Sequence, residues 1–269
     1  MIKFSWAIIA CFLMANDAFT QQKALFLVAG QSNAVGQGDS ATAIKCSPNA
    51  AFEYRFTDDT LVHLQDPVGA KELSFEMAGK GSICPAFAQK HAELTKKQVI
   101  IVAAARGGAS CHVKAELDNY GTWDKTGRLQ LFEKAVQKTE KAIAKTGVKL
   151  NGIIWLQGER DANAINSKNL TVEEYQQALE NLIKRFRAKF GKKVGFYIVQ
   201  TGYYTDHSKE GFDQVRQAQR NVAKKLGRTY IVYENTHQFK EKGWLKDLIH
   251  YNQAALNDIG ETIAKSISK

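Results

Sequence analysis

Short apolar runs without polar alternation recur along this 269-residue chain, and they constrain its fold more than any other feature. A strand with one solvent-exposed face alternates apolar and polar residues, whereas a continuous apolar run is typical of a strand that is covered on both faces. A glycine follows most of these runs within three residues. The runs are Ala24–Ala29, Gln98–Ala105, Asn151–Leu156, Val194–Val199 and Thr229–Tyr233.

Amphipathic helical patterns alternate with the apolar runs. Pro85 suits a first helical turn, and Thr171-Val-Glu-Glu has the pattern of a capping box. The alternation predicts an α/β fold: a three-layer α/β/α sandwich with a central, mostly parallel sheet. Residues 36–81 are poorly patterned and predict a long connection near the site. The expected helices are 84–95, 128–145, 171–190, 212–226 and 252–267.

Composition bounds the domain organisation and the partners. Hydrophobic residues make up 44% of the chain, prolines number 3, and no linker-like tract is present, so we expect one domain over residues 21–269. The net charge of +10 suggests nucleic acid, but the lysines are scattered along helical patterns and no nucleic-acid-binding motif accompanies them. We therefore expect no nucleic-acid partner.

The first residues predict a secretory signal peptide over residues 1–20. One lysine precedes an apolar run from Phe4 to Met14, and small and polar residues follow. The run is too short to span a bilayer comfortably, so an uncleaved anchor is the weaker interpretation. We expect cleavage near Ala18 to Gln21, a secreted or periplasmic protein, and no stable membrane insertion afterwards.

Three cysteines remain after that cleavage: Cys46, Cys84 and Cys111. An odd number allows at most one intramolecular disulfide and leaves one thiol. Cys111 and His112 are adjacent in sequence, but neighbouring side chains diverge, which disfavours a catalytic pair. Small buried residues or a single bridge are the favoured interpretations.

Two serines near the first run could act as nucleophiles. Ser32 follows the run by three residues, with Gly30 permitting a sharp turn, whereas Ser40 comes eight residues later with no strand before it. A nucleophilic hydroxyl needs a rigid position with free backbone amides beside it. Position therefore favours Ser32, although a serine after a strand is also a common helix cap.

Among the six histidines, His250 has the clearest catalytic context. Asp247 precedes it by three residues, and a tight turn can bring that carboxylate to the imidazole Nδ1–H. The alternative is that Asp247 caps a turn and His250 is a packed residue. His112 stands near the second strand end and stays a candidate for the pocket rim.

Candidate oxyanion donors follow three strands. Gly107 and Gly108 offer a backbone N–H at close approach, Gln157 offers a side-chain amide, and Ser32 offers its own backbone N–H. The alternatives are an ordinary Gly-Gly turn, and a buried glutamine bonded to backbone.

Assembled in order, these segments resemble the SGNH hydrolase superfamily, and within it the sialate O-acetylesterase-like branch that includes carbohydrate esterase family 6. The matching pieces span nearly the whole chain after residue 20. They are Gly30-Gln31-Ser32-Asn33, Ala105-Arg106-Gly107-Gly108, Trp155-Leu156-Gln157-Gly158-Glu159-Arg160-Asp161 and Asp247-Leu248-Ile249-His250-Tyr251-Asn252.

The resemblance implies a flavodoxin-like fold and removal of acetyl groups from sugar hydroxyls without a metal or cofactor. It implies Ser32 as nucleophile, His250 as base and Asp247 as its orienting partner. Ser32, Gly107 or Gly108, and Gln157 would form the oxyanion hole. Four further residues would support the site without reacting: Gln31, Asn33, Glu159 and Arg160.

The sequence departs from this pattern at two positions. Ala34 stands where the family often has Met, and Ala109 where Thr or Ser is common. We expect both near the acyl or sugar pocket, so they weaken inference of the substrate, for which acetylated sialic acid and acetylated xylan both stay open. Two alternative functions also stay open: an inactive glycan-binding protein of the same fold, and a short-chain lipase or thioesterase of the superfamily.

Overall fold

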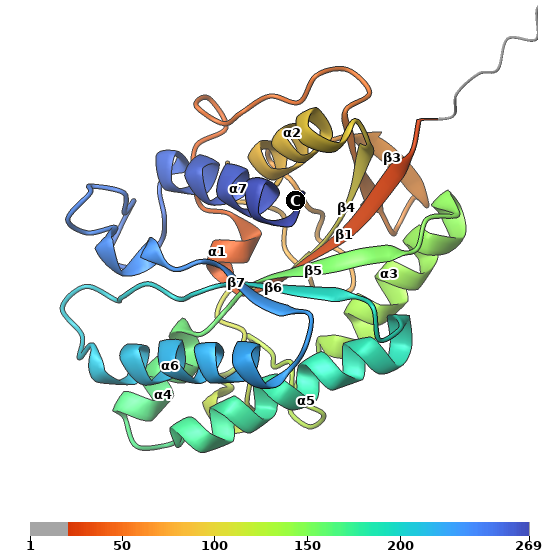
Figure 1. Ribbon diagram of the computed structural model, residues 1–269. Coiled ribbons are helices and arrows are strands. Elements are labelled where there is room, and N and C mark those ends of the chain that lie inside the picture. Colours follow the sequence, from red (N-terminus) through yellow and green to blue (C-terminus); the bar gives the residue numbers. More distant parts are fainter. Residues whose placement is uncertain (1–20, 269) are drawn as a thin grey trace, which may run out of the picture.

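The central sheet has seven strands in the order β3-β2-β4-β1-β5-β6-β7 (Figure 1). The computed structural model describes residues 21–268, so the expected signal peptide lies outside the described residues. Neighbouring strands are parallel except β2 and β3, which are antiparallel. The strands are β1 (Lys23–Gly30), β2 (Ala51–Arg55), β3 (Thr60–His63), β4 (Gln98–Ala105), β5 (Leu150–Leu156), β6 (Gly195–Val199) and β7 (Thr229–Tyr233).

Helices cover both faces of this sheet, which confirms the expected three-layer α/β/α arrangement. Figure 1 shows α2 and α7 on one side and α3, α5 and α6 on the other. None of the helices described for residues 21–268 combines the length and the hydrophobicity that a membrane span requires. The helices are α1 (Ser32–Val35), α2 (Cys84–Thr95), α3 (Phe132–Thr146), α4 (Glu159–Asn166), α5 (Val172–Phe190), α6 (Glu210–Lys225) and α7 (Gln253–Ile267), with short 3-10 turns η1 (Val113–Ala115) and η2 (Asn235–Gln238).

Strand β1 shows why its sequence lacks alternation. Leu25 and Leu27 belong to the apolar cluster under α3, α5 and α6, while Phe26 and Val28 belong to the cluster under α2 and α7. Successive side chains point to opposite faces, and here both faces are buried. The five strands expected from apolar runs are all present. The capping box at Thr171 is present too.

The structure corrects the expectation for residues 36–81. That segment is not a connection alone, because it contains the β2–β3 hairpin at one edge of the sheet. Glu53 is buried in the middle of β2, and β3 is largely exposed, so neither strand has an apolar run. Helix α3 also begins later than expected, since the segment before it pairs with the loop at Thr122.

Candidate active site

Strands β1, β4 and β5 terminate at the same edge of the sheet. Gly30, the last residue of β1, pairs with Ala105 at the end of β4 and with Leu156 at the end of β5. Strands β2 to β4 lie on one side of β1, and strands β5 to β7 lie on the other, so the strand order reverses at β1. Open α/β sheets bind ligands at the carboxyl ends of the strands where the order reverses. An open pocket of about 510 Å³ lies here. Its lining is Gln31, Ser32, Gln37, Glu76, Gly107, Gly108, Tyr120, Glu159, Arg160, Asn163, Tyr204, Ile249 and His250.

Ser32 enters this pocket on the sharp turn that follows β1. Gly30 has φ +141°, and a Cβ there would lie 2.0 Å from the carbonyl oxygen of Leu156, so the turn requires glycine. Ser32 then opens the one-turn helix α1, and no acceptor for its backbone N–H exists within residues 21–268. Ser40, the rival serine, lies in a turn and does not line the pocket.

Asp247 and His250 form the pair expected from their spacing. The imidazole Nδ1 lies 2.8 Å from Oδ2 of Asp247, and Oδ1 accepts the backbone N–H groups of Ile249 and His250 at 2.9 and 2.8 Å. Partial burial works against ionisation, but these N–H groups and the imidazole hold the pKa of Asp247 below its usual value. The carboxylate therefore stays charged and fixes the ring by its Nδ1.

Asn33 joins the serine turn to the histidine turn across 216 to 218 residues of sequence. Its Oδ1 accepts the N–H of Tyr251 at 3.1 Å, and its Nδ2 donates to the carbonyl of Ile249 at 3.3 Å. Both residues adjacent to His250 are thus attached to the residue adjacent to Ser32. Within residues 21–268, no hydrogen bond joins the Ser32 hydroxyl to the imidazole directly, and such bonds are often long without substrate.

The buried carboxyl of Glu159 anchors the Asn33 amide from behind. Asn33 Nδ2 donates to its Oε1 at 2.8 Å, and only 3% of Glu159 is exposed. Burial raises the pKa of Glu159 above its usual value, while the hydrogen bond from Asn33 opposes that rise. Glu159 therefore has the supporting position expected from the sequence.

The Gly107-Gly108 turn offers one free donor. Gly107 N donates to Oε2 of Glu76 at 3.1 Å, whereas no acceptor for Gly108 N is present in the described part of the chain. Gly108 has φ +69°, and a Cβ there would lie 2.7 Å from the Tyr120 ring. Only glycine fits this turn without strain, and the unpaired Gly108 N–H is the candidate oxyanion donor.

Gln157 does not offer its amide to the pocket in this structure. The side chain is 1% exposed, and its Nε2 hydrogen-bonds the carbonyl of Ala109 at 3.2 Å and the carboxylate of Asp161. The two N–H groups of a side-chain amide are thereby occupied. The expectation of a donor at Gln157 is not met in this arrangement, and the alternative of a buried, backbone-bonded glutamine describes it better.

Gln31 and Asp161 complete the polar layer beneath the pocket. Gln31 Oε1 accepts the N–H groups of Gly158 and Arg160 at 3.3 and 3.2 Å, so it holds the turn from β5 into α4. Asp161 accepts the N–H groups of Cys111 and His112 at 2.8 and 2.9 Å. These contacts tie together the turns that follow β1, β4 and β5.

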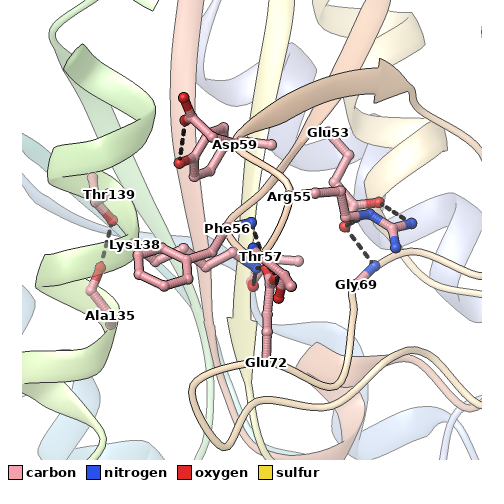
Figure 2. Close-up of polar contacts among 12 residues, drawn as sticks. Glu53, Arg55, Phe56, Thr57, Asp59, Gly69, Glu72, Ala135, Lys138 and Thr139 are labelled. Atoms are coloured by element: carbon pink, nitrogen blue, oxygen red, sulfur yellow. Dashed lines mark hydrogen bonds and ion pairs between the residues drawn. The ribbon is translucent and has the colours of Figure 1, made fainter. Parts of the chain in front are cut away.

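Glu76 is a pocket residue that the sequence did not indicate. It arrives on the connection after β3, which an interior ion pair anchors: Lys138 Nζ lies 2.7 Å from Glu72, and both side chains are almost fully buried. Glu72 also accepts the backbone N–H groups of Phe56 and Thr57 (Figure 2). The pattern of residues 36–81 contains no local signal for this path, because α3 supplies the lysine.

Two other expectations from the sequence concern the three cysteines and the two alanines that depart from the family pattern. Cys46, Cys84 and Cys111 are all buried and free, so no disulfide joins them. Burial raises the pKa of Cys46 to about 12 and raises those of the other two thiols as well, which opposes thiolate chemistry. Ala34 and Ala109 are buried, and neither lines the pocket, although Ala34 stands two residues from Ser32 and Ala109 directly follows Gly108, which do.

Comparisons with known proteins give the family of the chain and structures of similar fold. Residues 22–269 match the family "Carbohydrate esterase, sialic acid-specific acetylesterase". A search of curated proteins found no match. A protein from Arabidopsis thaliana is similar in structure, with a TM-score of 0.66 at 20% identity over 91% of this chain and 97% of that one.

Two further solved structures share the fold. NanS superposes with a TM-score of 0.63 at 15% identity, over 92% of this chain and 97% of that one. A carbohydrate esterase family 2 enzyme with a carbohydrate-binding domain, from Corynascus thermopiles, gives 0.50 at 13% identity over 92% and 65%. At these identities the likeness shows the α/β fold alone. The family match covers nearly all the described residues, and the chain belongs to the carbohydrate esterase family of sialic acid-specific acetylesterases.

Proposed function

We propose that this protein removes acetyl groups from sugar hydroxyls through an acyl-enzyme formed on Ser32. One observation carries the proposal: Asn33 attaches the residues on both sides of His250 to the turn that holds Ser32. The nucleophile and the base consequently line one pocket, and the base is oriented by Asp247. This is the recurrent constellation of serine hydrolases, recognised by geometry and roles.

The first step forms the acetyl-enzyme. His250 accepts the Ser32 proton through Nε2, and the Ser32 oxygen attacks the acetyl carbonyl carbon. The oxyanion that forms accepts the backbone N–H groups of Ser32 and Gly108. Collapse breaks the ester bond, and the sugar oxygen leaves with the proton from the imidazolium.

Water completes the cycle. His250 takes a proton from water as it attacks the acetyl-enzyme, and collapse returns that proton to Ser32 and releases acetate. Asp247 keeps its charge throughout and stabilises the imidazolium.

Ser32→Ala and His250→Ala are the variants that test the proposal. We expect each to lower kcat on p-nitrophenyl acetate by at least about 10³-fold, since nucleophile and base act as one unit. Ser40→Ala is the matched control and keeps wild-type turnover. Wild-type-like turnover by Ser32→Ala would reject the assignment.

A chain-length series separates acetylesterase from lipase or thioesterase activity. We expect acetate esters to be preferred over butyrate and longer chains, and acetate to be released from acetylated glycans. A wild-type protein that releases no acetate from any acetylated glycan or synthetic ester supports the inactive glycan-binding alternative instead.

We also propose that residues 1–20 are a cleaved export signal, as their sequence pattern indicates. N-terminal sequencing of protein recovered outside the cytoplasm should give a start between residues 18 and 22. An intact Met1 on exported protein contradicts this.

A further inference from the structure

A second cavity adjoins the active-site pocket and takes no part in the proposed acyl transfer. It has a volume of about 220 Å³ and lies between residues of two segments, the loop 203–209 after β6 and the stretch 236–245 before the histidine turn. Figure 1 shows both segments at the left of the view. Tyr204 lines this cavity and the active-site pocket, so the two spaces are neighbours. We call the second space the side cavity.

Backbone contacts attach the side cavity to the segment that holds the catalytic base. Thr205 N donates to the Leu248 carbonyl at 2.8 Å, which joins the loop after β6 to the turn that bears His250. Leu245 lines the side cavity and forms an isolated antiparallel bridge with Tyr251, on the other side of the same turn. Both walls of the cavity are therefore fixed relative to the imidazole.

The side cavity lies on the side of the pocket toward which the leaving sugar points. Strand β4, which precedes the oxyanion donor Gly108, lies on one side of β1, and β6, whose following loop forms the cavity, lies on the other. In the proposed acyl transfer His250 gives its proton to the sugar oxygen, so that oxygen faces the imidazole. The sugar then extends away from Gly108 and toward Tyr204, where the side cavity begins.

Aromatic rings make up much of the lining of the side cavity. Tyr204 and His207 stack with ring centroids 3.8 Å apart and planes inclined by 13°. Tyr203 makes an edge contact with His237 at a centroid distance of 6.5 Å. A pyranose ring presents apolar C–H faces to such rings and hydroxyl groups to the polar side chains beside them. The lining and the size of the cavity suit one sugar ring.

His237 supplies a fixed hydrogen-bond donor. Its Nδ1 lies 3.0 Å from Nη2 of the buried Arg216, and a guanidinium only donates, so Nδ1 accepts and the ring proton is on Nε2. Nδ1 also lies 3.0 Å from the Glu234 carbonyl, but that carbonyl already accepts from Arg216 at 2.7 Å. Within residues 21–268 the Nε2–H has no acceptor, and a ligand hydroxyl can provide one.

The charges of the side cavity favour a neutral ligand. Lys240 Nζ lies 3.8 Å from Asp206, and Lys209 Nζ lies 4.8 Å from the centre of the Tyr203 ring. Glu241 adds a second carboxylate, so two lysines and two acids line the same space. Both ammonium groups already have a partner, and the carboxylates repel an anion. Neutral hydroxyl groups can instead donate to the carboxylates.

We propose that the side cavity binds a neutral sugar unit that is glycosidically linked to the acetylated sugar. The preferred substrate is then an acetylated sugar within an oligosaccharide, and not the same sugar alone. The inference rests on the proposed acetylesterase function and concerns the part of the substrate beyond the acetylated ring. Binding energy from a unit remote from the reacting bond can lower KM or raise kcat.

The test compares acetylated sugars that differ only in the linked unit. O-acetyl sialic acid is assayed as its methyl glycoside and as its lactoside. O-acetyl xylose is assayed as its methyl glycoside and as the terminal unit of methyl xylobioside. Each pair carries the acetyl group on the same hydroxyl and has the same anomeric configuration. We expect the longer member of at least one pair to have a kcat/KM about 10- to 100-fold higher.

Two variants locate the effect in the side cavity. His207→Ala removes an aromatic ring from the lining, and Thr205→Trp fills the space. In both we expect the ratio of kcat/KM between the longer and the shorter substrate to fall toward one, whatever the absolute rates. His63→Ala is the matched control, because His63 is also an exposed histidine but lies on β3, at the opposite edge of the sheet from β7. It should keep the wild-type ratio.

Binding to the Ser32→Ala protein measures the same preference without turnover. Calorimetric titration with the intact pairs should give a Kd about 10- to 100-fold lower for the longer member. The Thr205→Trp change made in the same background should remove that difference.

The outcomes separate this inference from the proposed function. If wild type treats both members of each pair alike, prefers the shorter ones, or keeps its ratio in both variants, the role of the side cavity is overturned while Ser32-dependent esterase activity stands. A ratio that falls in either variant and persists in His63→Ala supports the role. Absence of Ser32-dependent turnover on p-nitrophenyl acetate refutes the esterase itself, and the ratio of Kd values then decides on the side cavity alone.

Discussion

Replacing Asn33 by alanine tests whether its side chain aligns the base with the nucleophile. The change removes three hydrogen bonds, to Glu159 at 2.8 Å, to the Ile249 carbonyl at 3.3 Å and from the Tyr251 N–H at 3.1 Å. A typical hydrogen bond contributes about 1 kcal/mol net, and the Tyr251 N–H is left buried without a partner. We expect the free energy of unfolding to fall by about 3–5 kcal/mol.

The kinetic loss should exceed what a stability change explains. The turn bearing His250 is released from the Ser32 turn, and a misplacement of about 1 Å costs roughly 10²-fold in rate. We therefore expect kcat on p-nitrophenyl acetate to fall by about 10²-fold in Asn33→Ala, measured at a temperature where urea titration shows the variant fully folded. The change in KM should be small.

Asn257→Ala is the matched control. Asn257 on α7 also uses both ends of its amide, accepting from Gln253 at 2.8 Å and donating to the Thr42 carbonyl at 3.0 Å. It does not line the pocket. We expect about 1–2 kcal/mol of lost stability and kcat within about twofold of wild type. If folded Asn33→Ala keeps kcat within about threefold of wild type, Asn33 does not position the base.

Three further predictions concern single contacts. Asp247→Asn should lower kcat by about 10²–10⁴-fold with little change in KM, because the imidazole loses the partner that sets its tautomer; steady-state kinetics checks this. Gly108→Ala should cost about 1–2 kcal/mol and at least tenfold in kcat, since a Cβ meets the Tyr120 ring at a positive φ and displaces the donor. Thermal unfolding and kinetics measure both effects, and an active, stable variant contradicts the donor assignment. For Glu72, burial opposes ionisation, but Lys138 and backbone N–H groups hold its pKa below the ordinary 4.5. Its contribution is fully present above pH 4.5 and is lost as the pH falls through the lower folded value, so urea titrations should show a steeper acid loss of stability in wild type than in Glu72→Gln.

The parallel part of the sheet was predictable because strands that are buried on both faces consist mainly of apolar residues, and this pattern is visible in the sequence. Each central strand contains a continuous apolar run, as β1 does. The β2–β3 hairpin has no such apolar run, because β2 contains a buried Glu53 that pairs with Arg55, and β3 is exposed. Helix α4, Glu159–Asn166, was missed for a related reason, since two of its four buried residues, Glu159 and Asp161, are charged. The periodicity of apolar residues in a sequence does not reveal helices and strands whose burial depends on polar partners far away in the chain.

The candidate site divides in the same way. Ser32, Gly108 and the Asp247–His250 pair could be found because each depends on a short segment: a strand end, a glycine turn, a three-residue spacing. Glu76 could not, because its path depends on an ion pair between Glu72 and Lys138, which lie 66 residues apart.

For Gln157, the sequence predicted the position of the residue but not the direction of its side chain. Its position at the end of β5 was correct, but the direction of its amide depends on Asp161, four residues on, and on the Ala109 carbonyl from another strand end. Asp161 is in turn held by the backbone of Cys111 and His112. A buried amide points to the acceptors that satisfy it, so the role of such a residue follows from the whole polar layer. That layer fixes the three turns, and in the described part of the chain the backbone N–H groups of Ser32 and Gly108, two residues that line the pocket, have no acceptor.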